Sequence, residues 1–345
     1  MYKRTDTKVV DIGGVKIGGG NKIAIQSMTN TKTADVEATV RQILSLEEVG
    51  CDIIRVAVLD NDDALAISDI KKRIHIPLVA DIHFNGDFAL QAVRSGADKI
   101  RLNPGNIENE KKIKEILDLC NEKNVPIRIG VNSGSLNKKY AHSEESMIAS
   151  ALEYLDIFHK YNFDNVVFAF KSSDPLETLR AYRLAANTFN YPLHLGVTEA
   201  GGLLNSTIKS SVALGSLLLD GIGDTIRISI SDDPLEEIKV AKKLLKTCGL
   251  KDDVPNLISC PTCGRIQYDM IPIVKEMEAY LEKVNKDVNI AIMGCPVNGV
   301  QEASRADFGV AGGKDSAVFF RKGKIVRTIP SEDIIKVLKE EVDKF

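Results

Sequence analysis

The feature that most constrains the fold of this 345-residue chain is a series of short apolar segments that alternate with segments of helical pattern. The apolar segments are rich in β-branched residues and start 22 to 39 residues apart, at Ile23, Asp52, Pro77, Lys99, Pro126, Asn165, Leu193 and Thr225. Strands of this kind, separated by amphipathic helices such as those expected over 34–50 and 109–124, are typical of a parallel sheet covered by helices.

Eight β-α units within about 230 residues predict a (β/α)8 TIM barrel. An open doubly wound sheet is the weaker interpretation, because no glycine-rich dinucleotide-binding turn follows the first strand. The preceding segment KVVDIGGVKIGGGN predicts a β-hairpin that turns at Gly13 and Gly14 and closes the bottom of the barrel.

A second, smaller domain is expected after Gly249, which has the position of a helix C-cap and is followed by the linker KDDVPN. The pattern beyond it predicts a strand, a helix, a strand, a hairpin and a terminal helix, over 257–259, 268–284, 289–294, 316–329 and 331–345. We therefore expect a barrel domain over 1–250 and a small α/β domain, of ferredoxin or sulfite-reductase type, over 255–345.

Composition excludes several classes of protein. A formal charge of −3 gives no footprint for nucleic acid or an anionic membrane, and no apolar run approaches the roughly 18 residues that cross a bilayer. Six cysteines in a chain of this length do not form the dense pattern of a disulfide framework. We expect a cytoplasmic protein without nucleic-acid or membrane partners.

Polar residues at the carboxyl ends of barrel strands are the candidates for an active site. They are Arg55, Asp81, His83, Arg101, Asn103, Arg128, Asn132, Lys171, Thr198, Glu199, Arg227 and Ser229. Five of the strands carry an arginine or lysine, and a charge in an apolar strand is unfavourable unless it is matched.

Two explanations of these strand cations stay open. Converging on one mouth, they would bind a compact polyanion such as a phosphate or diphosphate ester. Alternatively, they are structural and form ion pairs with Asp52, Asp81, Asp98 and Asp224. Glu199, in the turn TEAGG, is the acid best placed for proton transfer, whereas His83 is either a second proton donor or a packing residue.

The cysteines fall into two groups. Cys51, Cys120 and Cys248 stand alone in apolar surroundings and are expected in the core, whereas CPTC and MGCPVNG group three others, Cys260, Cys263 and Cys295. Three grouped thiols predict a metal site. A structural zinc would need a fourth cysteine or a histidine, yet the last histidine is His194, inside the barrel. An iron-sulfur cluster tolerates three cysteines with an open or oxygen-bound fourth iron, and Glu302 is the nearest acid beyond Cys295.

Seven motifs resemble, in the same order, those of the 4-hydroxy-3-methylbut-2-en-1-yl diphosphate synthase family. They are QSMTNT (26–31), RLNPGN (101–106), IRIGVNSGSL (127–136), LGVTEAGG (195–202), GIGDTIR (221–227), CPTCGR (260–265) and MGCPVNG (293–299). The resemblance covers essentially the whole chain. It implies the reductive ring opening of 2-C-methyl-D-erythritol 2,4-cyclodiphosphate, with two electrons delivered one at a time through a [4Fe-4S] cluster.

The resemblance also implies roles for individual residues. Cys260, Cys263, Cys295 and Glu302 would bind the cluster, and Glu199 would donate a proton. The cyclic diphosphate would be held by Arg55, Arg101, Arg128, Asn132, Lys171, Arg227 and Ser229, with Asn298 approaching from the cluster side. The family usually has Pro-Gly before the glutamate, whereas Val300 and Gln301 stand here.

The resemblance further implies a homodimer, in which the cluster domain of one subunit caps the barrel of the other, and flavodoxin or ferredoxin as electron donor. Two other classes of function stay open on the residues alone. One is a barrel lyase or pterin-type transferase whose small domain holds a structural zinc. The other is a binding scaffold joined to a pure electron-transfer module.

Overall fold

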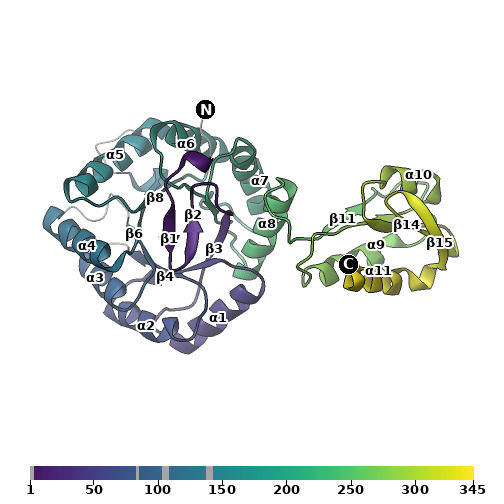
Figure 1. The fold of residues 1–345 in the computed structure, drawn as a ribbon, viewed down its shortest axis with the longest axis horizontal. Coiled ribbons are helices and arrows are strands. Elements are labelled where there is room, and N and C mark those ends of the chain that lie inside the picture. The colour runs from purple at the N-terminus through teal and green to yellow at the C-terminus, as the bar shows by residue number, and fades with distance from the viewer. Residues whose placement is uncertain (1–3, 83–84, 103–108, 137–142) are drawn as a thin grey trace. The chain divides into compact units, whose positions relative to one another are not determined.

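The computed structural model describes residues 4–82, 85–102, 109–136 and 143–345. The chain divides into two compact units, Met1–Leu250 and Lys251–Phe345 (Figure 1). Each unit has its own hydrophobic core, and each is described separately below.

The first unit is built around eight parallel strands. They are β3 (Ala24–Met28), β4 (Ile53–Val58), β5 (Leu78–Ile82), β6 (Lys99–Leu102), β7 (Ile127–Asn132), β8 (Val166–Lys171), β9 (His194–Leu195) and β10 (Thr225–Ile226). They pair in the order β8-β7-β6-β5-β4-β3-β10-β9, and a parallel bridge between Phe168 and Leu193 brings the two ends of the sheet together. The predicted barrel is therefore confirmed.

Helices surround this sheet on its outer side (Figure 1). They are α1 (Val36–Glu48), α2 (Asn61–Lys71), α3 (Gly86–Arg94), α4 (Glu110–Lys123), α5 (Glu144–Lys160), α6 (Pro175–Thr188), α7 (Leu203–Leu219) and α8 (Pro234–Thr247). All except α7 follow an aspartate, asparagine or serine whose side chain accepts a hydrogen bond from the first turn. Each capping residue lies between a helix and the loop that comes from the carboxyl end of the preceding strand, so the caps fix where the loops at the barrel mouth end.

The amino-terminal segment closes the other end of the barrel. After a 3-10 turn at Arg4–Asp6, β1 (Val10–Ile12) and β2 (Val15–Ile17) form an antiparallel hairpin. Its buried apolar residues pack against residues at the start of four barrel strands, Ala24, Ile53, Val79 and Val167. The predicted plug is confirmed, and Figure 1 shows the hairpin across the centre of the ring. A ligand must therefore enter from the carboxyl ends of the strands.

The second unit is a five-stranded mixed sheet with helices. Its elements are β11 (Asn256–Ser259), α9 (Met270–Leu281), β12 (Asn289–Met293), α10 (Pro296–Glu302), β13 (Phe308–Gly312), β14 (Ser316–Arg321), β15 (Lys324–Pro330), a 3-10 turn (Ser331–Asp333) and α11 (Ile334–Lys344). The strands lie side by side in chain order, parallel from β11 to β13 and antiparallel from β13 to β15.

The two faces of this small sheet are covered differently. Helices α9 and α11 contribute Met277, Leu281, Leu338 and Val342 to a core with alternate strand residues such as Ile290. The opposite face is packed mainly with small residues. Ala303 and Ala306 lie at the end of α10 and just beyond it, and they contact Ala291, Ala311 and Phe320. The short helix α10 thus lies alone against one face of β12 and β13.

Two elements of the small unit were missing from the sequence interpretation, namely α10 and β13. Helix α10 has seven residues, too few for a periodic pattern to emerge, and β13 is FGVAG, with two glycines in five residues. As a result, Glu302 is the last residue of a helix and does not lie in a loop. None of the described helices is long and apolar enough to span a membrane.

Candidate active site

The middle of the barrel is lined by buried polar and charged side chains, where most such barrels are filled by branched apolar residues. Lys99 of β6 donates to Gln26 Oε1 of β3 at 3.3 Å. Because β3 and β6 are not neighbours in the sheet, both side chains lie inside the barrel. The buried polar residues contributed by the strands and the segments that follow them include Gln26, Arg55, Asp81, Lys99, Arg101, Arg128, Lys171 and His194.

Cations exceed acids in this interior. Arg55 Nε lies 3.6 Å from Asp81 Oδ2, and Arg101 Nη1 lies 3.1 Å from Asp81 Oδ1. Arg227, just after β10, places Nη2 3.2 Å from Glu237 Oε1. Within the described residues, the six strand cations (Arg55, Lys99, Arg101, Arg128, Lys171 and Arg227) form ion pairs with these two carboxylates alone. The site therefore carries excess positive charge when its cations are protonated.

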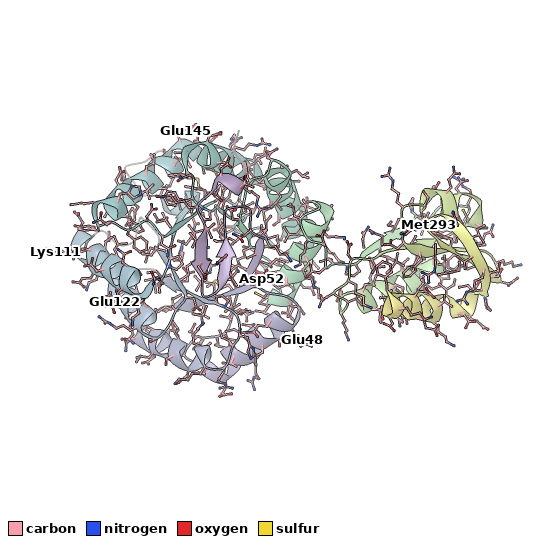
Figure 2. The ribbon with its side chains drawn as sticks, viewed as in Figure 1. Glu48, Asp52, Lys111, Glu122, Glu145 and Met293 are labelled. Atoms are coloured by element: carbon pink, nitrogen blue, oxygen red, sulfur yellow. The ribbon has the colours of Figure 1, made fainter. Side chains whose placement is uncertain are left out.

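The alternative explanation, that the strand cations are structural ion pairs, holds only for Asp81. Asp224 lies 3.8 Å from Arg4 and Asp98 lies 2.5 Å from Lys71, both at the amino-terminal side of the strands. Asp52, which is labelled in Figure 2, directly precedes β4 in the chain and accepts a hydrogen bond from the backbone N–H of Ile25. Three of the six strand cations, Lys99, Arg128 and Lys171, thus form no ion pair within the described residues and are left for a ligand.

The unpaired donors point to the same conclusion. Arg128 is fully buried, yet its Nε and Nη1 have no hydrogen-bond partner in the described part of the chain, and the same is true of Arg101 Nε. A buried donor without an acceptor is destabilising by about 1–3 kcal/mol or more when charged. An anion that enters the mouth would supply the missing acceptors.

Burial shifts the ionisation of these groups. It lowers the pKa of Lys99, Arg128 and Lys171 well below their ordinary values, and the neighbouring cations lower it further. Burial also lowers the pKa of Arg55 to about 10, with Asp81 opposing the shift. Bound negative charge would raise these pKa values again, so the pocket is electrostatically suited to a polyanion.

The end of Lys171 is positioned by His194 of the neighbouring strand β9 and by Gly196, just after that strand. His194, which is fully buried, places Nε2 3.5 Å from Lys171 Nζ, and its Nδ1 lies 2.7 Å from Thr225 Oγ1. Burial and then the Lys171 charge lower the pKa of His194 well below its usual value, so the ring is neutral and can accept from Lys171. Gly196 leaves the space that the Lys171 ammonium group occupies, because a Cβ at this position would lie 2.6 Å from Lys171 Nζ.

Glu199 lies at the mouth, on the turn after β9. It is exposed, and its φ of 51° is unusual for a residue other than glycine. The adjacent Thr198 anchors this turn, since its backbone N–H donates to Ser172 O at 3.1 Å. Strained backbone of this kind is often found where a side chain is held for a function.

The remaining predicted residues of the mouth have mixed outcomes. Asn132 ends β7 directly opposite Lys171, and Ser229 follows β10, where its carbonyl accepts from Ser206 Oγ. His83 and Asn103 lie outside the described residues.

Sequence reasoning missed three buried residues of the site. Lys99 lies two residues before Arg101, and this period of two placed it on the same face of the strand, a signal that could have identified it. His194 lies two residues before Gly196, the same spacing of two along the chain. Glu237 is different, because an acid in the first turn of a helix normally faces solvent. Here it accepts from Ser27 Oγ at 2.7 Å and from Arg227, contacts that only the tertiary structure reveals.

The three grouped cysteines lie in the small unit. Cys260 follows β11, and Cys295 precedes α10 one residue after Gly294 at the end of the neighbouring strand β12, whose last residue Met293 is labelled in Figure 2. The backbone N–H of Gly294 donates to Cys260 Sγ at 3.2 Å, so the two cysteine-bearing segments are adjacent. Cys263 is exposed.

Among the described side chains, no three histidine, cysteine, aspartate or glutamate residues are close enough together to hold a metal ion. Glu302 lies at the far end of α10 from Cys295, about 10 Å along the axis. The donor set nevertheless suits an iron-sulfur group, because it offers thiols, one backbone N–H aimed at a sulfur and no histidine. By contrast, Cys51 and Cys120 are buried in the barrel core as predicted, and burial raises the pKa of each thiol to about 12.

Comparisons with known proteins agree with this picture. Residues 7–242 match the family model described as GcpE TIM-barrel domain, and residues 256–344 match the GcpE protein C-terminal domain. A relative from Geobacillus thermodenitrificans is 51% identical over 100% of this chain and 94% of its own length. Relatives from Malacoplasma penetrans and Bacillus subtilis are 49% and 50% identical, over 99% of this chain and 96% and 92% of theirs. All three are named 4-hydroxy-3-methylbut-2-en-1-yl diphosphate synthase (flavodoxin).

Among solved structures, the barrel is similar to dihydropteroate synthases. The Yersinia pestis enzyme matches with a TM-score of 0.52 and 14% identity, over 70% of this chain and 98% of that one. The enzyme from Stenotrophomonas maltophilia gives 0.51 and 15%, with 70% and 98% covered. At this level of identity the likeness shows the fold alone.

The fold and the site define a (β/α)8-barrel enzyme with a cysteine-bearing second unit. The comparisons identify it further: the chain belongs to the 4-hydroxy-3-methylbut-2-en-1-yl diphosphate synthase family, an iron-sulfur oxidoreductase family of isoprenoid biosynthesis. The family resemblance in the sequence motifs is thereby confirmed.

Proposed function

We propose that the chain converts 2-C-methyl-D-erythritol 2,4-cyclodiphosphate to 4-hydroxy-3-methylbut-2-enyl diphosphate in non-mevalonate isoprenoid biosynthesis. The reaction opens the ring, takes up two electrons and two protons, and releases water. The observation that carries the proposal is the barrel interior, where six strand cations meet two carboxylates among the described residues. A cyclic diphosphate would supply the acceptors that these donors lack.

The substrate would be bound by the cations at the carboxyl ends of the strands. Asp81 would act indirectly, since it pairs with two of them and fixes their guanidinium planes. Glu199 would donate a proton at the mouth. The residues proposed to contact the cyclic diphosphate are Arg55, His83, Arg101, Arg128, Asn132, Lys171, Thr198, Arg227 and Ser229, with Asn298 from the small unit.

The cofactor would be a [4Fe-4S] cluster bound by Cys260, Cys263, Cys295 and Glu302. Such a cluster supplies electrons one at a time, and a carboxylate-bound iron is more easily opened to another oxygen ligand than one held by thiolate. Flavodoxin is the proposed donor, as it is in the names of the relatives, and a cytoplasmic location stays a prediction.

A homodimer is also proposed, with the cluster unit of one subunit capping the barrel of its partner. Helix α7 supports the association, because Leu204, Ile208, Val212 and Leu219 are all at least half exposed. Lys209 is the one charged residue in this 17-residue helix. A groove between α7 and α8, lined by residues such as Gly215, Val240 and Leu244, continues this apolar surface.

Gly196→Ala should weaken the binding of the cyclic diphosphate. The new Cβ would displace Lys171 Nζ, which it approaches to 2.6 Å, and would also crowd Arg227 O at 3.0 Å. A hydrogen bond to a charged group contributes about 1.5–3 kcal/mol, so KM should rise roughly 10- to 100-fold with a smaller change in kcat. Gly202→Ala is the matched control, since a Cβ there meets no atom within 4 Å. An unchanged KM in the first variant would show that Lys171 does not contact the substrate.

The proposed activity is tested on protein purified without oxygen. We expect a brown protein with broad absorbance near about 400 nm, close to four iron and four sulfide per chain, and turnover of the cyclic diphosphate with a one-electron donor. Electron paramagnetic resonance of the reduced protein should change when the substrate is added. A colourless protein with one zinc per chain and no sulfide would instead support a barrel transferase with a structural metal.

A further inference from the structure

One face of the small sheet is left open at its edge. Helices α9 and α11 cover one face of the sheet. On the opposite face, α10 packs mainly on β12 and β13. The edge strand β15 is exposed at six of its seven residues. Ile325 and Val326 have 66% and 55% of their surface exposed, and Ile325 pairs with Phe320, which belongs to the core under α10. An apolar strip therefore continues outward from α10.

Basic residues lie beside this strip, along the edge strand and at the hairpin tip, and the strand register places Lys324 and Arg327 toward the face covered by α9 and α11. Arg305, Lys322, Lys324 and Arg327 are all exposed. Residues 303–328 contain six basic and two acidic residues, although the chain as a whole has a net charge of −3. We call Arg305, Lys322, Lys324, Ile325, Val326 and Arg327 the basic edge. Its charge is opposite in sign to that of the rest of the protein.

The basic edge rests on the segment that follows the proposed cluster ligand. A Cβ on Gly323, at the tip of the β14-β15 hairpin, would lie 3.0 Å from Ser304 Cβ, and Ser304 comes two residues after Glu302. The backbone N–H of Lys322 donates to Asp307 O at 3.2 Å. In the sheet, β15 lies two strand spacings from β13, a distance of about 10 Å. The hairpin tip therefore contacts the residues that directly follow α10.

From these observations we propose that the basic edge is the docking surface for an acidic electron-donor protein of the flavodoxin class. The proposal rests on the proposed function, which requires such a donor. Encounters between redox proteins use small interfaces and are steered by complementary charge, and a few exposed apolar residues with cations beside them along one sheet edge suit both requirements. A second copy of this chain is a poorer occupant, because a two-fold contact would place the same cations against each other.

The test reverses two charges and compares donors. In the double variant Lys322→Glu/Lys324→Glu, kcat/KM for reduced flavodoxin should fall at least tenfold at low salt, and the loss should shrink as ionic strength rises. Turnover with a small chemical reductant, and the iron content, should stay unchanged. The matched control is Lys275→Glu/Lys283→Glu, which changes the net charge equally at two exposed lysines, one on α9 and one just after it.

Two further measurements keep the test decisive. Titration calorimetry of flavodoxin binding needs no turnover and should show the same salt-dependent weakening. Ile325→Ser/Val326→Ser should weaken binding while leaving its salt dependence as in the parent protein. Unaltered flavodoxin binding in the charge-reversed variant, an equal loss with the chemical reductant, or a change in oligomeric state would each overturn the proposal. Absence of turnover by the parent protein with the chemical reductant would contradict the proposed function instead.

Discussion

Cys295→Ala is expected to remove iron and sulfide from the protein and to reduce turnover below detection. Cys295 stands at the point where β12 passes into α10, next to the Gly294 N–H that donates to Cys260 Sγ. With only Cys260 and Cys263 left, the site would retain two thiols, too few for a stable four-iron cluster. Iron and sulfide analysis and the absorbance near about 400 nm measure the loss directly.

The fold should survive this substitution. Cys295 occupies the N-cap of α10, but its side chain makes no capping hydrogen bond there, so alanine removes no stabilising contact of the helix. Circular dichroism and the thermal midpoint should therefore match those of the parent protein stripped of iron within a few degrees. Cys248→Ala is the control, since this partly buried thiol lies at the end of α8 in the barrel. Full iron content in Cys295→Ala would exclude Cys295 as a ligand.

Glu199→Gln is expected to lower kcat by roughly 10²- to 10⁴-fold, the usual contribution of a positioned general acid. Glutamine keeps the size of the side chain and cannot supply the proton. The proposed cluster ligands lie on the other unit, so iron content and absorbance should not change. Steady-state turnover of the cyclic diphosphate, measured with the same one-electron donor, gives the comparison.

A second variant separates the acid from the backbone strain at this position. Aspartate tolerates positive φ better than glutamate and retains a carboxyl group, so Glu199→Asp should keep more activity than Glu199→Gln. Glu122→Gln, at an exposed position on α4 labelled in Figure 2, controls for the loss of one surface charge. If Glu199→Gln turned over normally, Glu199 would have no part in the chemistry.

Much of the fold could be predicted because its signals are local. The eight apolar strands and the capped helices between them follow the chain's own periodicity, and the Gly13-Gly14 turn is encoded by two adjacent residues that adopt positive φ. Strand β13 could not be predicted because two of its five residues are glycine, and helix α10 could not because seven residues are too few to show a helical period. The same limit hid the helical position of Glu302.

The candidate site was predictable to the extent that a charge inside an apolar strand is conspicuous. Arg55, Arg101, Arg128 and Lys171 could be identified in this way, and all four are buried in the barrel. Glu237 could not, because a helix-start glutamate gives no sign that it will contact Ser27, 210 residues away. Which acid pairs with which cation depends on closure of the sheet.

By itself, the sequence determined the kind of protein this is: a parallel barrel, a smaller second unit and a set of strand cations and grouped cysteines, all legible because they depend on composition and spacing along the chain. Only the tertiary structure decided that Asp81 and Glu237 match some of those cations while Arg128 keeps unpaired donors, and that α10 leaves the basic edge uncovered. The physical reason is that burial, charge pairing and the covering of a sheet face are set by residues far apart in sequence, which meet only after the chain has folded.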